Sequence, residues 1–273
     1  MLADALACEG FKLWRNRAAL FWGFLFVPLV ALVIGVGVEL WFRGAVARSN
    51  VIPALDLARV MLKAVADAGS PFTQLFLLIA GASVFGGEYR WETWRLLTPR
   101  NSRANLLAAK ALVVAAAAAA SVALIAFAGI AAGLIGALGR HAPTVWNGEH
   151  GFVLQFAGLF LISWLQVLQP LAVGALAAVV SRSILAAVMT PIVLGVVQAL
   201  MMSQLGPGGL ATPPLWGFLA LPGLSVELLR AAIGDVPLPA ATIWSAGAAL
   251  AGWVILPVVA AGVVFQRQDL SRE

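Results

Sequence analysis

Long apolar stretches constrain the fold of this chain more than any other feature of its sequence. Six can be drawn, at residues 19–41, 71–86, 106–138, 152–180, 184–204 and 240–265. About 20 apolar residues cross the hydrocarbon core of a bilayer, so all but the short second stretch are long enough for a membrane-spanning helix. With 62% hydrophobic and 11% charged residues, the chain has too little charge to cover a soluble surface. We therefore expect an all-α, polytopic integral membrane protein with about six transmembrane helices in a single domain, residues 1–273.

Basic residues beside these stretches indicate the orientation. With the N-terminus inside, eleven of the seventeen Lys and Arg residues fall on the cytoplasmic side, as the positive-inside rule requires. Four of the other six, Arg43, Arg48, Arg59 and Lys63, lie in one outer segment. We predict that both termini are cytoplasmic. The same rule explains the net charge of +5, so we expect membrane lipid and no nucleic acid as a partner.

Two segments outside the stretches have the pattern of amphipathic helices. In residues 1–18 we expect Leu2, Leu6, Leu13 and Trp14 to face lipid while Asp4, Glu9, Lys12 and Arg15 stay in water, which is typical of an interfacial helix. In residues 55–67, charged side chains recur at spacings of three and four on one face. This second helix is expected on the outer surface of the membrane, or in contact with a substrate or partner.

Residues 205–239 contain six prolines among apolar turns. The segment is too broken for a full span and too apolar for a solvated loop. We therefore predict short half-helices that dip into the outer leaflet, with Pro222 and Gly223 at the bend between them.

The motifs of most enzymes are missing. No lysine follows a glycine in the phosphate-binding pattern, so we expect no ATP, and no cofactor of any kind, to be bound by this chain itself. His141 and His150, with Glu149, form either a weak metal site or a solvated loop. Within the apolar stretches only Glu39 and Lys110 are charged, which disfavours an ion-coupled carrier. Gly129 and Gly133 permit close helix packing, either within the chain or in a dimer seam.

The stretch "GGEYRWETWRLLTPRNSR" at residues 86–103 concentrates charge and tryptophan between apolar neighbours. No Pro or Gly interrupts it from Glu88 to Leu97, Pro99 would stop a helix, and Asn101 or Ser102 could cap the next one. Trp91, Trp94 and Arg95 share one side of that helix, while Glu88 and Glu92 align with each other. The element would suit a groove on a soluble partner. The alternative is an interfacial aromatic belt, which leaves both carboxylates unexplained.

These residues resemble the segment that follows the second span in permeases of ABC-2-type ABC transporters. The chain has "FGGEYRWETWRLLTPRNSRANLLAAKAL", similar to the family pattern E-x-x-x-x-[TS]-x-R-x-L-L-x-x-P-x-[SR]-R, and it ends in the similar "FQRQDL". Seven residues occupy the matching motif positions: Glu88, Thr93, Arg95, Leu96, Leu97, Pro99 and Arg103.

The resemblance implies a transmembrane permease subunit in a bacterial inner membrane. It implies a dimer with a second permease subunit, identical or not, in which a cytoplasmic coupling helix at 88–99 docks an ABC ATP-binding subunit that supplies ATP and magnesium. Residues 1–18 would be the elbow helix, and 205–239 the outer half-helices. The chain would not itself be an enzyme, and export is the expected direction. The alternative function is a membrane scaffold or assembly factor that holds a soluble partner without transport.

Overall fold

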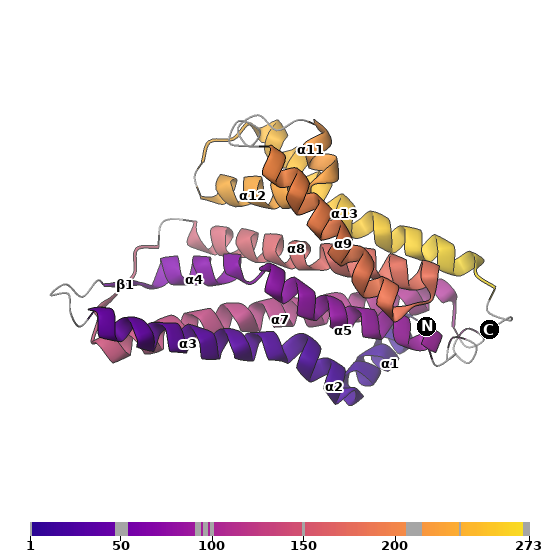
Figure 1. Cartoon of the computed structure of the whole chain (residues 1–273), viewed down its shortest axis with the longest axis horizontal. Helices are drawn as coiled ribbons and strands as arrows, with labels where there is room; N and C mark the ends of the chain where they lie inside the picture. The colour runs from indigo at the N-terminus through magenta and orange to yellow at the C-terminus, as the bar shows by residue number, and fades with distance from the viewer. Residues whose placement is uncertain are drawn as a thin grey trace.

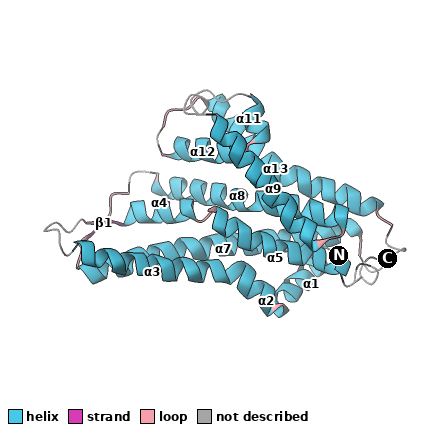
Figure 2. Cartoon of the chain, in the orientation of Figure 1, coloured by secondary structure: helices cyan, strands magenta, loops and turns pink. Residues whose placement is uncertain are grey.

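The computed structural model describes residues 2–46, 54–90, 94, 98, 101–148, 151–205, 215–234 and 236–269. Within these ranges the chain is almost entirely helical and forms an elongated bundle (Figure 1, Figure 2). In chain order the elements are α1 (Leu2–Arg15), α2 (Arg17–Ala19), the π-helix η1 (Leu20–Leu25), α3 (Phe26–Val46), β1 (Leu55–Asp56), α4 (Leu57–Asp67), α5 (Pro71–Arg90), α7 (Arg103–Arg140), β2 (Thr144–Val145), α8 (Phe152–Ser181), α9 (Ile184–Gln204), α11 (Leu215–Ala220), α12 (Pro222–Ile233) and α13 (Ala240–Arg267).

Five helical stretches in the described ranges are long and apolar enough to cross a membrane: Arg17–Trp41, Arg103–Arg140, Phe152–Ser181, Ile184–Gln204 and Ala240–Arg267. Helix α5 passes the same test only together with α4, from which it is bent by 47°. This is the architecture of a multi-pass membrane protein, and it reaches the expected six spans when the bent pair counts as one. Figure 1 shows both ends of the chain at the same end of the bundle, as an even number of crossings requires.

Side-chain caps define where several helices begin. The Ser102 hydroxyl accepts a hydrogen bond from the Asn105 amide, which confirms Ser102 as the cap of α7. At its other end, α7 stops at His141, whose φ of 53° is left-handed. Arg182 ends α8 in the same way, and Ser183 then caps α9. These local signals make the connection from α8 to α9 only two residues long.

Helix α4 packs against the bundle through one face, and its position at the outer membrane surface stays a prediction. It lies against α7 and α8, and its Val65 is fully buried. The approach is close because α7 has glycines there: a Cβ built on Gly129 would lie 2.8 Å from the Cβ of Ala64, and one on Gly133 would lie 3.0 Å from Val60 Cγ1. The two glycines therefore serve packing within the chain. The predicted amphipathic pattern is present, but its apolar face meets protein.

Helix α1 packs against α7, and it differs from the sequence interpretation in two respects. Leu6 and Leu13 pack against the main buried core of the bundle and not toward lipid. Glu9, expected in water, is only 5% exposed, because it finds a cationic partner on α7. Leu2 and Trp14 are exposed as expected.

The two short helices predicted within residues 205–239 are present as α11 and α12. They are separated at Leu221, and Pro222 occupies the first turn of α12, where its missing amide hydrogen costs nothing. Residues 206–214 lie outside the described ranges. The described pair packs against α13 and, through α12, against α8.

At the opposite end from the chain termini, β1 and β2 form a two-residue parallel pairing, with Leu55 opposite Thr144. Near this end Glu39 of α3 pairs with Arg140 of α7. Charge inside a membrane helix is costly unless paired, so this ion pair explains how α3 accommodates its carboxylate.

Candidate functional site

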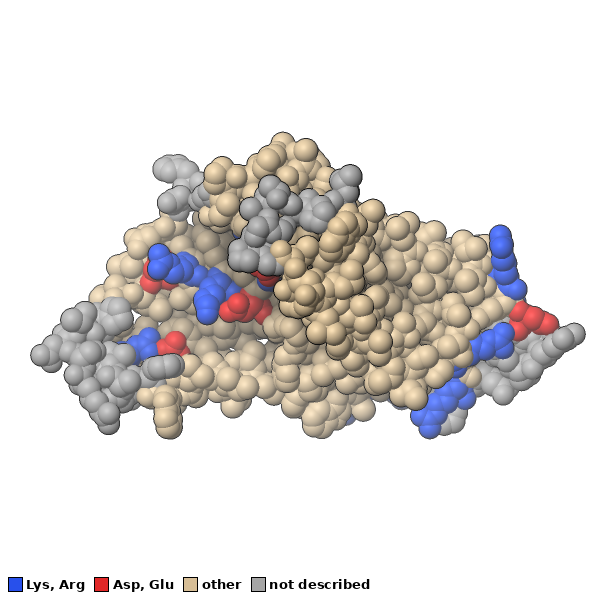
Figure 3. Space-filling model, turned by 45° about the horizontal axis from the view of Figure 1, so that its top comes forward, with Lys and Arg blue, Asp and Glu red and all other residues tan. Residues whose placement is uncertain are grey.

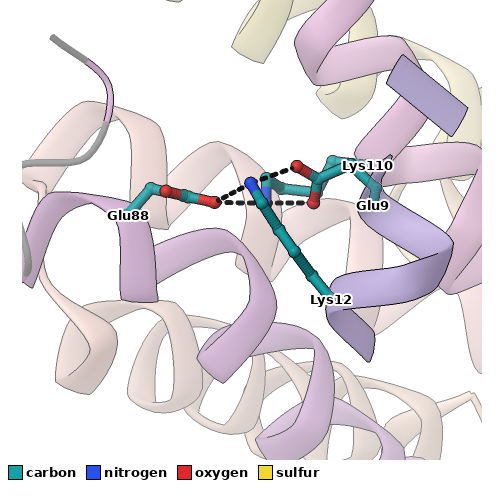
Figure 4. Close-up of polar contacts among 4 residues, drawn as sticks. All are labelled: Glu9, Lys12, Glu88 and Lys110. Atoms are coloured by element: carbon teal, nitrogen blue, oxygen red, sulfur yellow. Dashed lines mark hydrogen bonds and ion pairs between the residues drawn. The ribbon is translucent and has the colours of Figure 1, made fainter. Parts of the chain in front are cut away.

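Helices α1, α5 and α7 each bring charged side chains to one point near the chain termini (Figure 4). The ammonium group of Lys110 donates to Glu9 Oε2 at 2.6 Å and to Glu88 Oε1 at 3.2 Å. The ammonium group of Lys12 donates to Glu9 Oε1 at 2.8 Å and to Glu88 Oε1 at 2.9 Å. We call these four residues the ion cluster. Its two positive and two negative charges balance, which is the condition for burying it.

Most of the ion cluster is withdrawn from solvent. Lys110 is 2% exposed and Glu88 is 9% exposed, whereas the Lys12 side chain stays 38% exposed beside a cavity of 300 Å³. Burial raises the pKa of the Glu9 carboxyl, but the ammonium groups of Lys110 and Lys12 outweigh burial, and the pKa lies below its ordinary value. Burial likewise lowers the pKa of Lys12, and the carboxylates of Glu9 and Glu88 outweigh it and raise that pKa. Both groups are charged at neutral pH.

Trp94 lies between this cluster and α13. Its ring centroid is 4.5 Å from that of Phe265 and 5.8 Å from that of Tyr89, and the Lys110 ammonium lies 5.6 Å from its centre. Cations are attracted to the face of an indole at this range. The side chain is 2% exposed, so Trp94 joins α5, α7 and α13 within the chain.

The end of α13 is hydrogen-bonded to the start of α7. The Arg103 guanidinium donates to the carbonyl oxygens of Phe265 and Gln266, at 3.1 and 3.3 Å, and to that of Gln268. The Tyr89 hydroxyl donates to Gln268 Oε1 at 2.9 Å. Residues 265–268 of the "FQRQDL" segment therefore meet Tyr89 and the motif residue Arg103, although they are far apart in the sequence. We call this set of residues the C-terminal clasp.

The structure describes three of the ten residues predicted for coupling: Glu88, Trp94 and Arg103. All three contact other parts of the chain, and the Trp94 indole is buried in these contacts; the coupling role predicted for the three is not tested by these contacts. The other seven, Trp91, Glu92, Thr93, Arg95, Leu96, Leu97 and Pro99, lie outside the described residues, and their docking role stays a prediction. Glu149 and His150 also lie outside, so the same holds for the possible metal site.

Sequence reasoning missed the residues that complete the site: Glu9, Lys12, Lys110, Phe265 and Gln268. One signal was available. Lys110 stands inside an otherwise uncharged apolar stretch, and such a lysine requires a counter-charge from elsewhere in the chain. Which carboxylates supply it depends on how α1 docks, and the pattern of α1 alone does not reveal that.

Comparison of the sequence with protein-family models and with curated proteins found no match. The case for a function therefore depends on the sequence motif and on this geometry. The geometry ties four helices together around residues 88–103: α5 and α7 directly, α1 through the ion cluster, and α13 through Trp94 and the C-terminal clasp.

Proposed function

We propose that this chain is the membrane-spanning permease subunit of an ATP-driven transporter of the ABC-2 type, and that it exports its cargo. A partner subunit binds and hydrolyses ATP, and it docks on residues 88–99 at the cytoplasmic side of a bacterial inner membrane. A second permease subunit completes the dimer. Both termini are cytoplasmic in this proposal.

The observation that carries the proposal is the joining of four helices beside the motif segment. A transporter must convert the movement of a soluble ATPase into movement of helices. A segment attached to a single helix would move that helix alone. Here α1, α5, α7 and α13 converge on residues 88–103, so a displacement of the segment is passed to all four. The resemblance of this segment to ABC-2 permeases is the independent support.

The burial of Trp94 changes the expected docking residues. Docking is assigned to Trp91, Glu92 and Arg95, and Trp94 anchors the segment to the bundle. Losing a buried tryptophan or arginine from an interface commonly costs on the order of 2 kcal/mol of binding or more. We therefore expect Arg95→Ala to weaken the association with the ATPase by about 30-fold, since about 1.4 kcal/mol corresponds to tenfold.

The test is affinity co-purification of the chain from its native membrane, followed by nucleotide binding and hydrolysis by the proteins recovered. An ATP-hydrolysing subunit should be recovered with the wild type and lost with Arg95→Ala. Arg17→Ala is the matched control, because Arg17 is exposed in α2 and lies outside both residues 86–103 and the "FQRQDL" ending. Recovery of the ATPase by both variants would refute docking through this segment. Recovery of a soluble partner that binds no nucleotide would favour the scaffold alternative.

A further inference from the structure

A mainly apolar cavity whose wall carries several amide side chains lies among the helices of the bundle, away from the ion cluster. It has a volume of 250 Å³ and lies among α5, α8, α9 and α12. Its polar lining comes from all four helices: Gln74, Gln166, Gln169, Gln198 and Glu227. Gln166 and Gln169 stand at the centre of the 30-residue α8. Amide side chains in a membrane helix are expensive unless they have partners, and they commonly mark a pathway.

The hydrogen bonds of these glutamines leave donors and acceptors unused. Gln74 Nε2 donates to the Gly69 carbonyl at 3.0 Å, and Gln198 Nε2 donates to the Ala220 carbonyl at 3.1 Å. The amide oxygens of both have no partner among the described residues. Gln166 Oε1 accepts from Arg230 at 2.8 Å, which leaves its amide hydrogens. Gln169 has no hydrogen bond to any described residue. The cavity wall can therefore both donate and accept.

Arg230 connects this cavity to a second one. Its guanidinium also donates to the Ala66 carbonyl at 2.6 Å and lies 3.7 Å from Glu227. On its other side Arg230 lines a cavity of 560 Å³ together with Asp56, Arg59 and Lys63. Figure 3 shows basic and acidic side chains grouped in a hollow on this face, apart from a second group at the other end of the molecule. Through its hydrogen bond to Gln166, Arg230 thus links the walls of the two cavities.

We propose that the glutamine-lined cavity binds a neutral part of the transported molecule that carries both hydrogen-bond donors and acceptors, as hydroxyl and amide groups do. The inference deepens the proposed function, on which it rests. An amide side chain matches such groups without charge. Among the described residues of the lining, Glu227 alone is charged, so this part of the cavity disfavours anionic groups. Purely hydrocarbon cargo would leave the side-chain amide of Gln169 without a hydrogen-bond partner, which is unfavourable once the cargo excludes water.

The first measurement asks whether the cavity holds water. In a Cys8→Ser background, Met202→Cys, which lines the cavity on α9 and leaves its glutamines in place, should react rapidly with a hydrophilic methanethiosulfonate reagent, because the thiolate forms only where water reaches. Val193→Cys is the matched control: Val193 lies on α9 and outside the cavity lining, and it is 60% exposed on the outside of the bundle. Reaction of Met202→Cys no faster than Val193→Cys would overturn the proposal.

The second measurement uses glucose, N-acetylglycinamide and inorganic phosphate as probes that compete with the same reaction. A bound probe slows labelling by a factor of one plus its concentration over its Kd, which is about tenfold at about ten times Kd. Protection by glucose identifies a hydroxylated cargo, and protection by N-acetylglycinamide identifies an amide one. Gln198→Leu should abolish that protection, whereas Gln204→Leu, at the exposed end of α9, should not.

Protection by neither neutral probe, stronger protection by phosphate, or protection that survives Gln198→Leu would each overturn the assignment. These results are independent of the docking test, because labelling needs no ATPase. If the ATPase associates normally and the probes do not protect, the cavity proposal alone fails. If the probes protect and no ATPase associates, the site stands and the transport mechanism fails.

Discussion

Removing the Lys110 ammonium should destabilise the protein more than removal of any surface lysine. Lys110 is 2% exposed and holds two carboxylates at 2.6 and 3.2 Å. Lys110→Met keeps the length of the side chain but leaves a net negative charge among Glu9, Lys12 and Glu88. Breaking a buried ion pair from one side costs about 3–5 kcal/mol. Lys12 still lies within 2.9 Å of both carboxylates, so we expect the lower limit, about 3 kcal/mol, or a fall in the unfolding temperature of roughly 6–12 °C.

Thermal unfolding in one detergent, followed by intrinsic fluorescence, measures this effect. Lys63→Met is the control, because Lys63 is 75% exposed and 3.6 Å from Asp67, and it should cost less than about 1 kcal/mol. Adding Glu9→Gln to Lys110→Met restores charge balance, and it should recover about 1–3 kcal/mol through the coupling of the two sites. If Lys110→Met behaves like Lys63→Met, or if the double variant equals the sum of the single ones, the ion cluster is not a buried coupled unit.

Three other results should follow from the structure. Gly129→Leu should separate α4 from α7 and cost about 1–3 kcal/mol by overpacking, since a Cβ there would lie 2.8 Å from the Cβ of Ala64; thermal unfolding measures it. The pKa of Glu9 is lowered in the folded protein, so its ionised carboxylate stabilises the contact of α1 with α7. This stabilisation is fully present above the unfolded pKa of Glu9, about 4.3, and is lost as the pH falls through the lower folded pKa. Proteolysis of α1 should therefore rise only in acid. A thiol reagent that does not cross membranes should label Asn147→Cys, in a Cys8→Ser background, in intact cells, and native Cys8 only after permeabilisation.

Each of these has an outcome that contradicts it. Gly139→Leu, where a new Cβ meets nothing within 4 Å, serves as the control for Gly129→Leu, and equal losses from both would show that close helix approach is not the cause. A Glu9→Gln variant should lose the acid-dependent step, and its persistence there would assign the step to another carboxyl. Labelling of native Cys8 in sealed cells would reverse the proposed orientation.

Much of the helical framework could be predicted from the sequence because it depends on local properties. Apolar length sets which segments can span a membrane, and four of the five long apolar stretches coincide closely with α7, α8, α9 and α13. Ser102 was a predicted cap because a hydroxyl before a helix satisfies amides three residues away. The break at Leu221 follows from Pro222, which donates no hydrogen bond and therefore begins a helix more readily than it continues one.

The candidate site could be predicted only in part. The pattern of residues 86–103 identified Glu88, Trp94 and Arg103, but as residues that would dock a separate partner protein. The structure instead places Trp94 against Phe265 and Arg103 against the carbonyls at the end of α13. A tryptophan has the same local signature whether it binds a separate protein or another helix of its own chain. The difference is decided by what approaches it in space.

The sequence by itself determined that this is a helical chain with several membrane-spanning segments, because hydropathy, helix length and caps act over a few neighbouring residues. Only the tertiary structure decided which side chains of different helices contact one another. It places Glu9 beside Lys110, packs α4 against the glycines of α7, and brings Gln74, Gln166 and Gln198 to one cavity. The physical reason is the same in each case: the free energy of a buried charge or amide depends on its partners, and these partners come from helices that are distant in the chain.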